Sequence, residues 1–151
     1  GDGIIYIHKI DSKYNLRMQS RIGRRNPLHT TAIGKVLLAE RDEQDIRQIL
    51  SVVEFTKSTD KTHENVESLL GELPTVKEQG FGEDNEEQEV GLRCLAVPVY
   101  DRFNQVVAGM SVSLPTIRFT EEKKTEYIAE LHAAAARISL KLGCKAYPHG
   151  K

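Results

Sequence analysis

The sequence has little of what marks several classes of protein. It contains two cysteines, Cys94 and Cys144, which give neither a disulfide framework nor a metal-ligand spacing, so we expect a reducing, cytoplasmic setting. It lacks any run of about 18 apolar residues, which excludes an ordinary membrane-spanning helix. Its formal net charge is −1, and no overall basic field therefore draws the chain to nucleic acid.

The sequence also lacks histidines at metal-ligand spacing, an N-terminal signal peptide and a large basic region. The five histidines have no ligand spacing, so the sequence predicts no zinc site and no cofactor. The chain starts without methionine or a signal pattern and reaches a strand almost at once, which favours a piece of a longer protein. The one basic run, Arg17, Arg21, Arg24 and Arg25, fits a solvated loop or an oligomer contact better than an anion-binding patch.

What is present is hydrophobic patterning for one domain of mixed structure. With 151 residues, of which 39% are hydrophobic, the chain has the length and composition of a single domain with one core. The patterns follow in the order hairpin, helices, hairpin, helix, which predicts an α+β fold with helices laid on one antiparallel sheet. The predicted strands cover residues 3–10 and 16–20 and a hairpin over 91–115, and the predicted helices cover 29–40, 41–51, 61–80 and 119–143.

Capping residues mark the predicted helix ends. The expected caps are Thr30 or Thr31, Thr62 and Thr120 at the N-terminal ends and Gly80 and Gly143 at the C-terminal ends. Pro74 lies inside the third pattern, so we expect a kink there or two segments. Residues 21–27 are predicted to be a loop, and the acidic residues 81–90 have no apolar period.

The predicted hairpin has one face of small, mildly polar side chains. A turn centred between residues 102 and 103 would place Cys94 opposite Ser111 and Leu92 opposite Ser113. The other face is apolar throughout and predicts a core. The small face either lets a helix pack closely or forms the floor of a ligand cavity, and the pattern leaves both open.

The start of the first predicted helix, in the stretch HTTAIG, offers a seat for an anion. The first amides of a helix have no acceptor inside the helix, and the helix dipole favours negative charge there. Because every helix has such an end, this feature alone is a weak indication of a binding site.

Three ordered blocks strongly resemble the effector-binding domain of IclR-type bacterial transcriptional regulators. They are Pro27–Ala39, Gly80–Asp101 and Ala108–Glu122, and the resemblance covers nearly the whole chain. It implies a GAF-like fold, in which a curved antiparallel β-sheet is flanked by α-helices. It implies that residues 1–151 are one effector-binding domain and that an N-terminal winged helix-turn-helix domain is absent from this chain.

The resemblance also implies partners and a set of ligand-binding residues. The expected partners are a second copy, as homodimer or tetramer, DNA only through the missing domain, and a small organic acid, 2-keto-3-deoxygluconate or a related oxo acid. The expected role is that of a repressor of genes for breaking down this compound, not of an enzyme. The implied ligand-binding residues are Met18, Ala32, Ile33, Asp84, Cys94, Ser111 and Ser113.

Each of these residues has an implied task. Amides of Ala32 and Ile33 would bind the carboxylate, and Asp84 would accept from ligand hydroxyls. The thiol and two serine hydroxyls would bond the remaining oxygens, while Met18 would pack on the carbon chain. Five neighbours, Glu83, Asn85, Glu86, Glu87 and Arg93, either contact the ligand or serve the surface, and the sequence does not decide between these roles.

Two other functions are compatible with the residues. Cys94 as nucleophile with His29 as base would make a Cys-dependent hydrolase, but the acidic run beside Cys94 opposes the electropositive setting that a reactive thiolate needs. The second alternative is a dimerisation module that binds no ligand.

Overall fold

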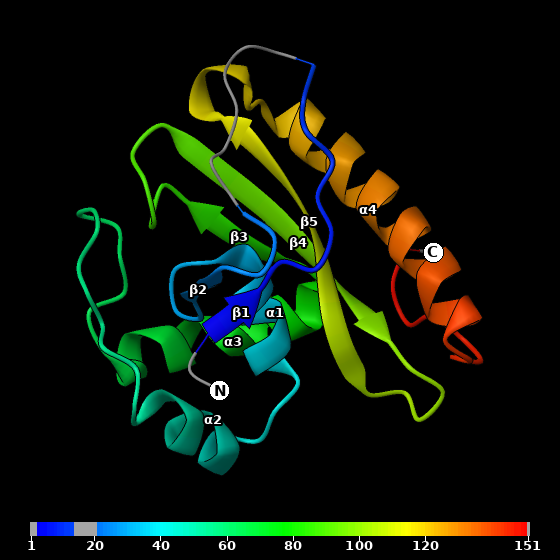
Figure 1. The fold of residues 1–151 in the computed structure, drawn as a ribbon, viewed down its shortest axis with the longest axis horizontal. Helices are drawn as coiled ribbons and strands as arrows, with labels where there is room; N and C mark the ends of the chain where they lie inside the picture. The colour runs from blue at the N-terminus through cyan, green and yellow to red at the C-terminus, as the bar shows by residue number, and fades with distance from the viewer. Residues whose placement is uncertain (1–2, 14–20, 151) are drawn as a thin grey trace.

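The structure, a computed structural model, describes residues 3–13 and 21–150 and has helices on both faces of a three-stranded sheet, with a separate two-stranded sheet beside it (Figure 1). The central antiparallel sheet has the order β3-β4-β5, and its strands are β3 (Gly82–Asn85), β4 (Leu92–Tyr100) and β5 (Val106–Pro115). The other elements are the antiparallel pair β1 (Gly3–Ile5) and β2 (Arg25–Pro27), the helices α1 (Ala32–Ala39), α2 (Glu43–Leu50), α3 (Val66–Gln79) and α4 (Glu121–Lys141), and the short 3-10 helix η1 (Thr116–Arg118). The predicted α+β fold is confirmed.

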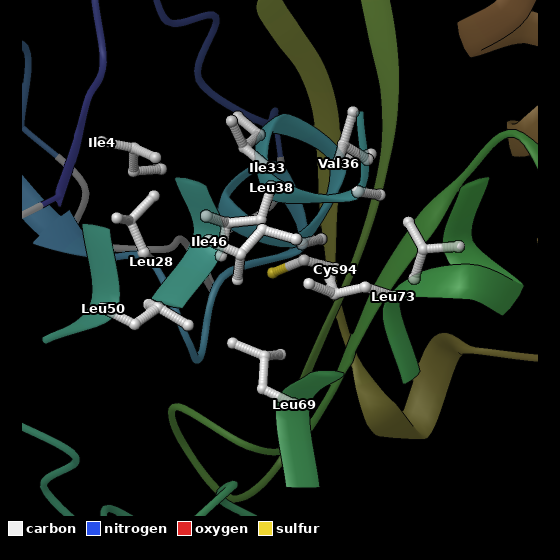
Figure 2. Close-up of a cluster of buried hydrophobic side chains, with 14 residues drawn as sticks. Ile4, Leu28, Ile33, Val36, Leu38, Ile46, Leu50, Leu69, Leu73 and Cys94 are labelled. Atoms are coloured by element: carbon white, nitrogen blue, oxygen red, sulfur yellow. The ribbon is translucent and has the colours of Figure 1, made fainter. Parts of the chain in front are cut away.

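The sheet separates two hydrophobic clusters because successive side chains of a strand point to opposite faces. Leu95, Val97 and Val99 of β4 pack with α4. Cys94 and Ala96, which alternate with them, belong to the cluster formed with α1, α2 and α3. Figure 2 shows the side chain of Cys94 pointing from the sheet into this second cluster. Within the described ranges, no helix combines the length and apolarity needed to cross a bilayer.

The β4–β5 pairing differs from the predicted register by two residues. Cys94 pairs with Ser113 and Ala96 with Ser111, so the predicted pairs Cys94–Ser111 and Leu92–Ser113 are wrong. The reason is a longer turn, in which the Asp101 carboxylate accepts hydrogen bonds from the amides of residues 103 and 105, and a register irregularity beside Val99 and Tyr100. An even shift preserves alternation, so the predicted division of residues between the two faces still holds.

Helix α1 begins as predicted from its capping residue. Thr31 has an extended backbone, and its hydroxyl accepts a hydrogen bond from the Gly34 amide at 3.1 Å. The same hydroxyl donates to the Pro27 carbonyl at 2.7 Å, which ties the helix to β2. Nearly every side chain of α1 is buried, because the helix packs on the sheet and is itself covered by α3 and β1.

The remaining helices agree with the sequence except at the start of α3. Thr120 caps α4, and Gly80 ends α3 in the left-handed conformation, as predicted. The N-cap of α3 is Asn65, whose side chain accepts from the Ser68 amide, so the prediction of Thr62 is wrong. Helix α3 is one helix with Pro74 inside it, not two segments.

The short strands depart furthest from the sequence prediction. The strand predicted over residues 3–10 ends at Ile5, and part of the predicted loop 21–27 forms β2. Strand β3 has the charged sequence GEDN and was not predicted, because only Gly82 and Asp84 turn into the protein. The predicted strand 16–20 lies outside the described residues.

We predict that Gly34→Ala destabilises the fold strongly. An added Cβ would lie 2.1 Å from the Leu28 carbonyl oxygen, a backbone atom that cannot rotate away. We expect a loss of about 3 kcal/mol or more, measured by urea unfolding monitored by circular dichroism. The matched control is Gly71→Ala in α3, where an added Cβ meets nothing within 4 Å, and which should gain about 0.5–1 kcal/mol. Equal stability of the two variants would contradict the close contact at Gly34.

Candidate functional site

A hollow lies between the start of α1 and the adjoining face of the sheet. It is lined by Tyr6, Thr31, Ala32, Ile33, Asp84, Gln88, Cys94 and Ser111. Its volume is about 230 Å³ when the open mouth is included, but its interior has room for about one water molecule. Five of the seven predicted residues, from α1, β3, β4 and β5, therefore meet at one place.

The other two predicted residues are not among the described residues that line the hollow. Ser113 does not line it, but its hydroxyl lies 3.1 Å from the Cys94 sulfur, so it contacts a residue that does. Met18 lies outside the described residues. Three lining residues, Tyr6, Thr31 and Gln88, were not predicted to bind ligand. The sequence indicates Thr31 as a possible helix cap and as part of the anion seat at HTTAIG, whereas Tyr6 and Gln88 reach the site through loops that no sequence period marks.

Asp84 is a nearly inaccessible carboxylate, 1% exposed, at the floor of the hollow. Its Oδ1 accepts hydrogen bonds from the amides of Glu87 at 2.7 Å and Gln88 at 3.4 Å. Burial raises the pKa of this carboxyl to about 6, and the two amide bonds offset only part of that effect. A carboxylate that is destabilised by its own surroundings is typical of a functional position.

Cys94 faces Asp84 across the β3–β4 ladder and is a poor nucleophile. Burial and the nearby Asp84 charge raise the pKa of its thiol to about 12, so almost no thiolate exists at neutral pH. His29, the base of the hydrolase hypothesis, does not line the hollow and packs against Phe55 with the two rings tilted, at a centroid distance of 4.7 Å. This arrangement favours a thiol that hydrogen-bonds over one that attacks.

The small face of the β4–β5 hairpin both lets a helix pack closely and borders the hollow. An added Cβ at Gly109 would lie 2.9 Å from Ile33, so this glycine allows α1 to pack tightly on β5. Farther along the same face, Cys94 and Ser111 line the hollow. Close packing at one end of the face and free space at the other follow from the same row of small side chains.

The start of α1 borders the hollow with residues of its first turn. The Thr31 hydroxyl, as the helix cap, accepts the hydrogen bond of the Gly34 amide. The amides of Ala32 and Ile33 also belong to the first turn, and the helix supplies no acceptor for them. Both residues line the hollow. The positive end of the helix dipole adds to the preference of this position for an anion.

The five neighbours whose role the sequence left open do not line the hollow, and four of them have charged side chains paired within the protein. Glu83 binds Arg93 and Lys124, and the Arg93 guanidinium lies over the Phe119 ring. Glu86 binds Lys61, and Glu87 binds Lys35. Asn85 is exposed. In this structure none of the five lines the hollow, and the four charged side chains are paired with other protein groups.

Tyr6 forms the part of the wall that sequence analysis missed most clearly. Burial, together with the nearby Cys94 and Asp84, raises the pKa of its phenol to about 12, so the hydroxyl stays protonated and can donate. The carbonyl of Tyr6 accepts a hydrogen bond from the Gly23 amide at 2.9 Å. Its segment contains only the three-residue strand β1, so few backbone bonds hold this wall.

Comparison with known proteins shows that nearly the whole chain is similar to one family of transcriptional regulators. The family model described as bacterial transcriptional regulator IclR C-terminal matches residues 1–140. The chain is 63% identical over 147 residues to the HTH-type transcriptional regulator KdgR of Escherichia coli K12 and to that of Dickeya chrysanthemi. These matches cover 97% of this chain but 56% and 48% of the two regulators, so the chain spans about half their length.

A solved structure gives the same result for the fold. The crystal structure of the C-terminal domain of the E. coli transcriptional regulator KdgR superposes with a TM-score of 0.83 at 56% sequence identity. The superposition covers 94% of this chain and 82% of that chain. The similarity therefore extends over the sheet and both helical layers.

We predict that Asp84→Asn stabilises the protein in a pH-dependent way. The pKa of Asp84 in the folded protein, about 6, lies above its ordinary value of 3.8, so ionisation weakens the fold as pH rises between these values. Asparagine keeps an acceptor for the Glu87 amide without the charge. The variant should match the wild type near pH 4 and exceed it by on the order of 3 kcal/mol at most above pH 7.

The measurement is urea unfolding in metal-free buffer across this pH range. Asp42→Asn is the control, because Asp42 makes the same kind of bond to a backbone amide at an exposed helix cap. An Asp84→Asn variant that follows the wild type at every pH would show that Asp84 is not destabilised by its surroundings.

Proposed function

The chain belongs to the IclR family of bacterial transcriptional regulators, as their C-terminal domain, and we propose that it senses a small keto acid or keto sugar acid bound in the hollow at the start of α1. The single observation that carries the proposal is the convergence at one hollow of a helix N-terminus, a buried carboxylate and small hydroxyl and thiol side chains. These groups complement the two ends of such a molecule.

Each end of the ligand has a matching partner. The acid group binds the amides of Ala32 and Ile33, where backbone donors and the helix dipole favour an anion. The oxo and hydroxyl oxygens bond Ser111 and Cys94, and they reach Ser113, which lies against Cys94 and does not line the present hollow, only once the hollow opens. Asp84 accepts from ligand hydroxyls, which favours a sugar acid such as 2-keto-3-deoxygluconate over a plain oxo acid.

Binding in this way requires the hollow to open. Its interior now has room for about one water molecule, which is too little for a six-carbon acid. Tyr6 and Gln88 are the lining residues on loops, while α1 and the sheet are fixed by extensive packing. We therefore assign the movement to the Tyr6 wall, with Met18, as the resemblance implies, meeting the carbon chain of the ligand.

The proposal extends to the longer protein. Because the chain spans about half the length of its relatives, a winged helix-turn-helix domain would carry the DNA contact and the effector domains would join as a homodimer or tetramer. The effector changes DNA affinity only through its different affinity for two arrangements of that oligomer. As a repressor in the cytoplasm, the protein would be released from DNA by its effector.

Titration calorimetry on this chain tests the binding step. We expect 2-keto-3-deoxygluconate to bind, and Asp84→Ala to weaken it at least tenfold more than it weakens pyruvate, which has no hydroxyl for Asp84. Asn85→Ala, at an exposed neighbour on β3, is the matched control and should change neither affinity. Equal losses for both acids would remove Asp84 from ligand selection. If no oxo acid binds, the dimerisation module is favoured instead.

Operator binding by the full-length protein tests regulation. We expect saturating 2-keto-3-deoxygluconate to weaken operator affinity at least tenfold, a coupling of about 1.4 kcal/mol, and Asp84→Ala to respond less at the same concentration. The readout is fluorescence anisotropy of labelled operator DNA at fixed salt, because DNA affinity depends steeply on salt. Unchanged affinity with ligand shown to be bound would refute the repressor mechanism.

A further inference from the structure

Outside the hollow, the most unusual group in the molecule is a fully buried lysine. Lys35 of α1 has no exposed surface. Its ammonium donates to Glu72 Oε1 at 2.9 Å, to the Glu83 carbonyl at 2.8 Å and to Glu87 Oε1 at 2.7 Å. These bonds use all three ammonium protons and join α1, α3 and the β3–β4 turn.

The same two carboxylates also face His63, and Glu72 Oε2 is shared between Lys35 and His63, since it lies 2.9 Å from the Lys35 ammonium as well. His63 Nε2 lies 2.6 Å from Glu72 Oε2 and 3.9 Å from Glu87 Oε2, and the three atoms all lie within 4.8 Å of one another. Glu87 Oε2 is buried and has no hydrogen-bond partner among the described residues, on a side chain that is 9% exposed. Two carboxylates face one lysine, so the cluster has the charge and the free oxygen for one more cation.

We propose that His63, Glu72 and Glu87 bind a divalent transition-metal ion of the zinc class. One imidazole nitrogen and two carboxylate oxygens are ligands that Zn²⁺ accepts, with a fourth position left for water. Metal–ligand bonds of about 2.1 Å require ligand atoms about 3.4 Å apart at the tetrahedral angle. The ion thus replaces the short His63–Glu72 hydrogen bond and draws His63 and Glu87 together by a few tenths of an ångström.

Two further features support this assignment. The His63 side chain is 18% exposed, so it has freedom to adjust and offers an entry path for the ion. Its Nδ1 lies 3.2 Å from Ser68 Oγ, and this hydroxyl can accept the Nδ1 proton when Nε2 binds metal. The sequence predicted no metal site because these ligands come from three separate segments with no ligand spacing.

The metal would act on the neighbouring hollow through the chain. The Glu87 amide donates to Asp84 Oδ1 at 2.7 Å, so an ion on Glu87 holds the turn that positions Asp84. The same cluster fixes α1 through Lys35, one turn after Ala32 and Ile33. The metal site is independent of the proposed effector, and either can be wrong without the other.

Zinc titration of the chelator-treated chain tests the site. We expect one Zn²⁺ per chain by elemental analysis after dialysis, a higher melting temperature, and an X-ray absorption spectrum with nitrogen and oxygen ligands but no sulfur. Sulfur ligands would assign the ion to cysteine and overturn the proposal. Mg²⁺ should not compete at equal concentration, since an imidazole ligand favours zinc; equal competition would overturn the assigned class.

Variants locate the ion. His63→Ala should bind Zn²⁺ about 100-fold more weakly or worse while keeping its metal-free circular dichroism spectrum, because the residue is partly exposed. Glu87→Gln tests the buried oxygen and should show the same loss. His8→Ala removes an exposed histidine elsewhere and should bind as the wild type does. No stoichiometric zinc in the wild type, or unchanged binding by folded His63→Ala, would overturn the proposal.

Discussion

The buried ammonium of Lys35 constrains most of this structure. A charged group without exposed surface is tolerated only when acceptors surround it, and here the acceptors come from α3, β3 and the turn after β3. Helix α1 therefore cannot rotate or slide without breaking several charge-assisted bonds at once. The amides of Ala32 and Ile33, a turn earlier in the same helix, keep their place at the hollow for this reason.

Close contacts at three glycines also fix the position of α1. A Cβ at Gly34 would meet the Leu28 carbonyl, one at Gly82 would lie 2.7 Å from the Ala32 carbonyl, and one at Gly109 would meet Ile33. Helix α1 thus lies backbone to backbone against the loop before it and against β3, and it packs the Ile33 side chain directly on the β5 backbone. Such packing holds the start of α1 firmly, which is consistent with the proposed movement of the segment that carries Tyr6.

The sequence predicted the parts of the fold whose determinants are local. The cap Thr120 and the alternation along β4 act within a few residues, and the sequence predicts both. It predicts Thr30 or Thr31 as the cap of α1, and the structure selects Thr31. Asn65 and Thr62 are both good caps by type, and the choice between them depends on the Thr62 hydroxyl binding the distant Glu87 carbonyl at 2.6 Å. The sequence did not predict strand β3, because the Asp84 carboxylate can point inward only when amides of the following turn donate hydrogen bonds to it.

The same division applies to the site. Cys94, Ser111 and Ser113 share a face by strand alternation, which a sequence displays, and family resemblance pointed to Asp84 and the start of α1. The inward direction of Lys35 and its approach to Glu72 and Glu87 depend on contacts across 37 and 52 residues, which no local pattern contains. Tyr6 likewise reaches the hollow from the far end of the chain.

The irregular pairing beside Val99 and Tyr100 has a consequence for how this hairpin can change. A shift of the β4–β5 register by two residues, from an insertion or deletion in the turn at 101–105, leaves the Cys94 thiol and the serine hydroxyls on the face that meets α1. A shift by one residue would place on that face the side chains that now meet α4. A bulge absorbs an odd residue locally and restores the parity of the strand beyond it. The tip of the hairpin can therefore change in length while the side chains that line the hollow stay on their face of the sheet.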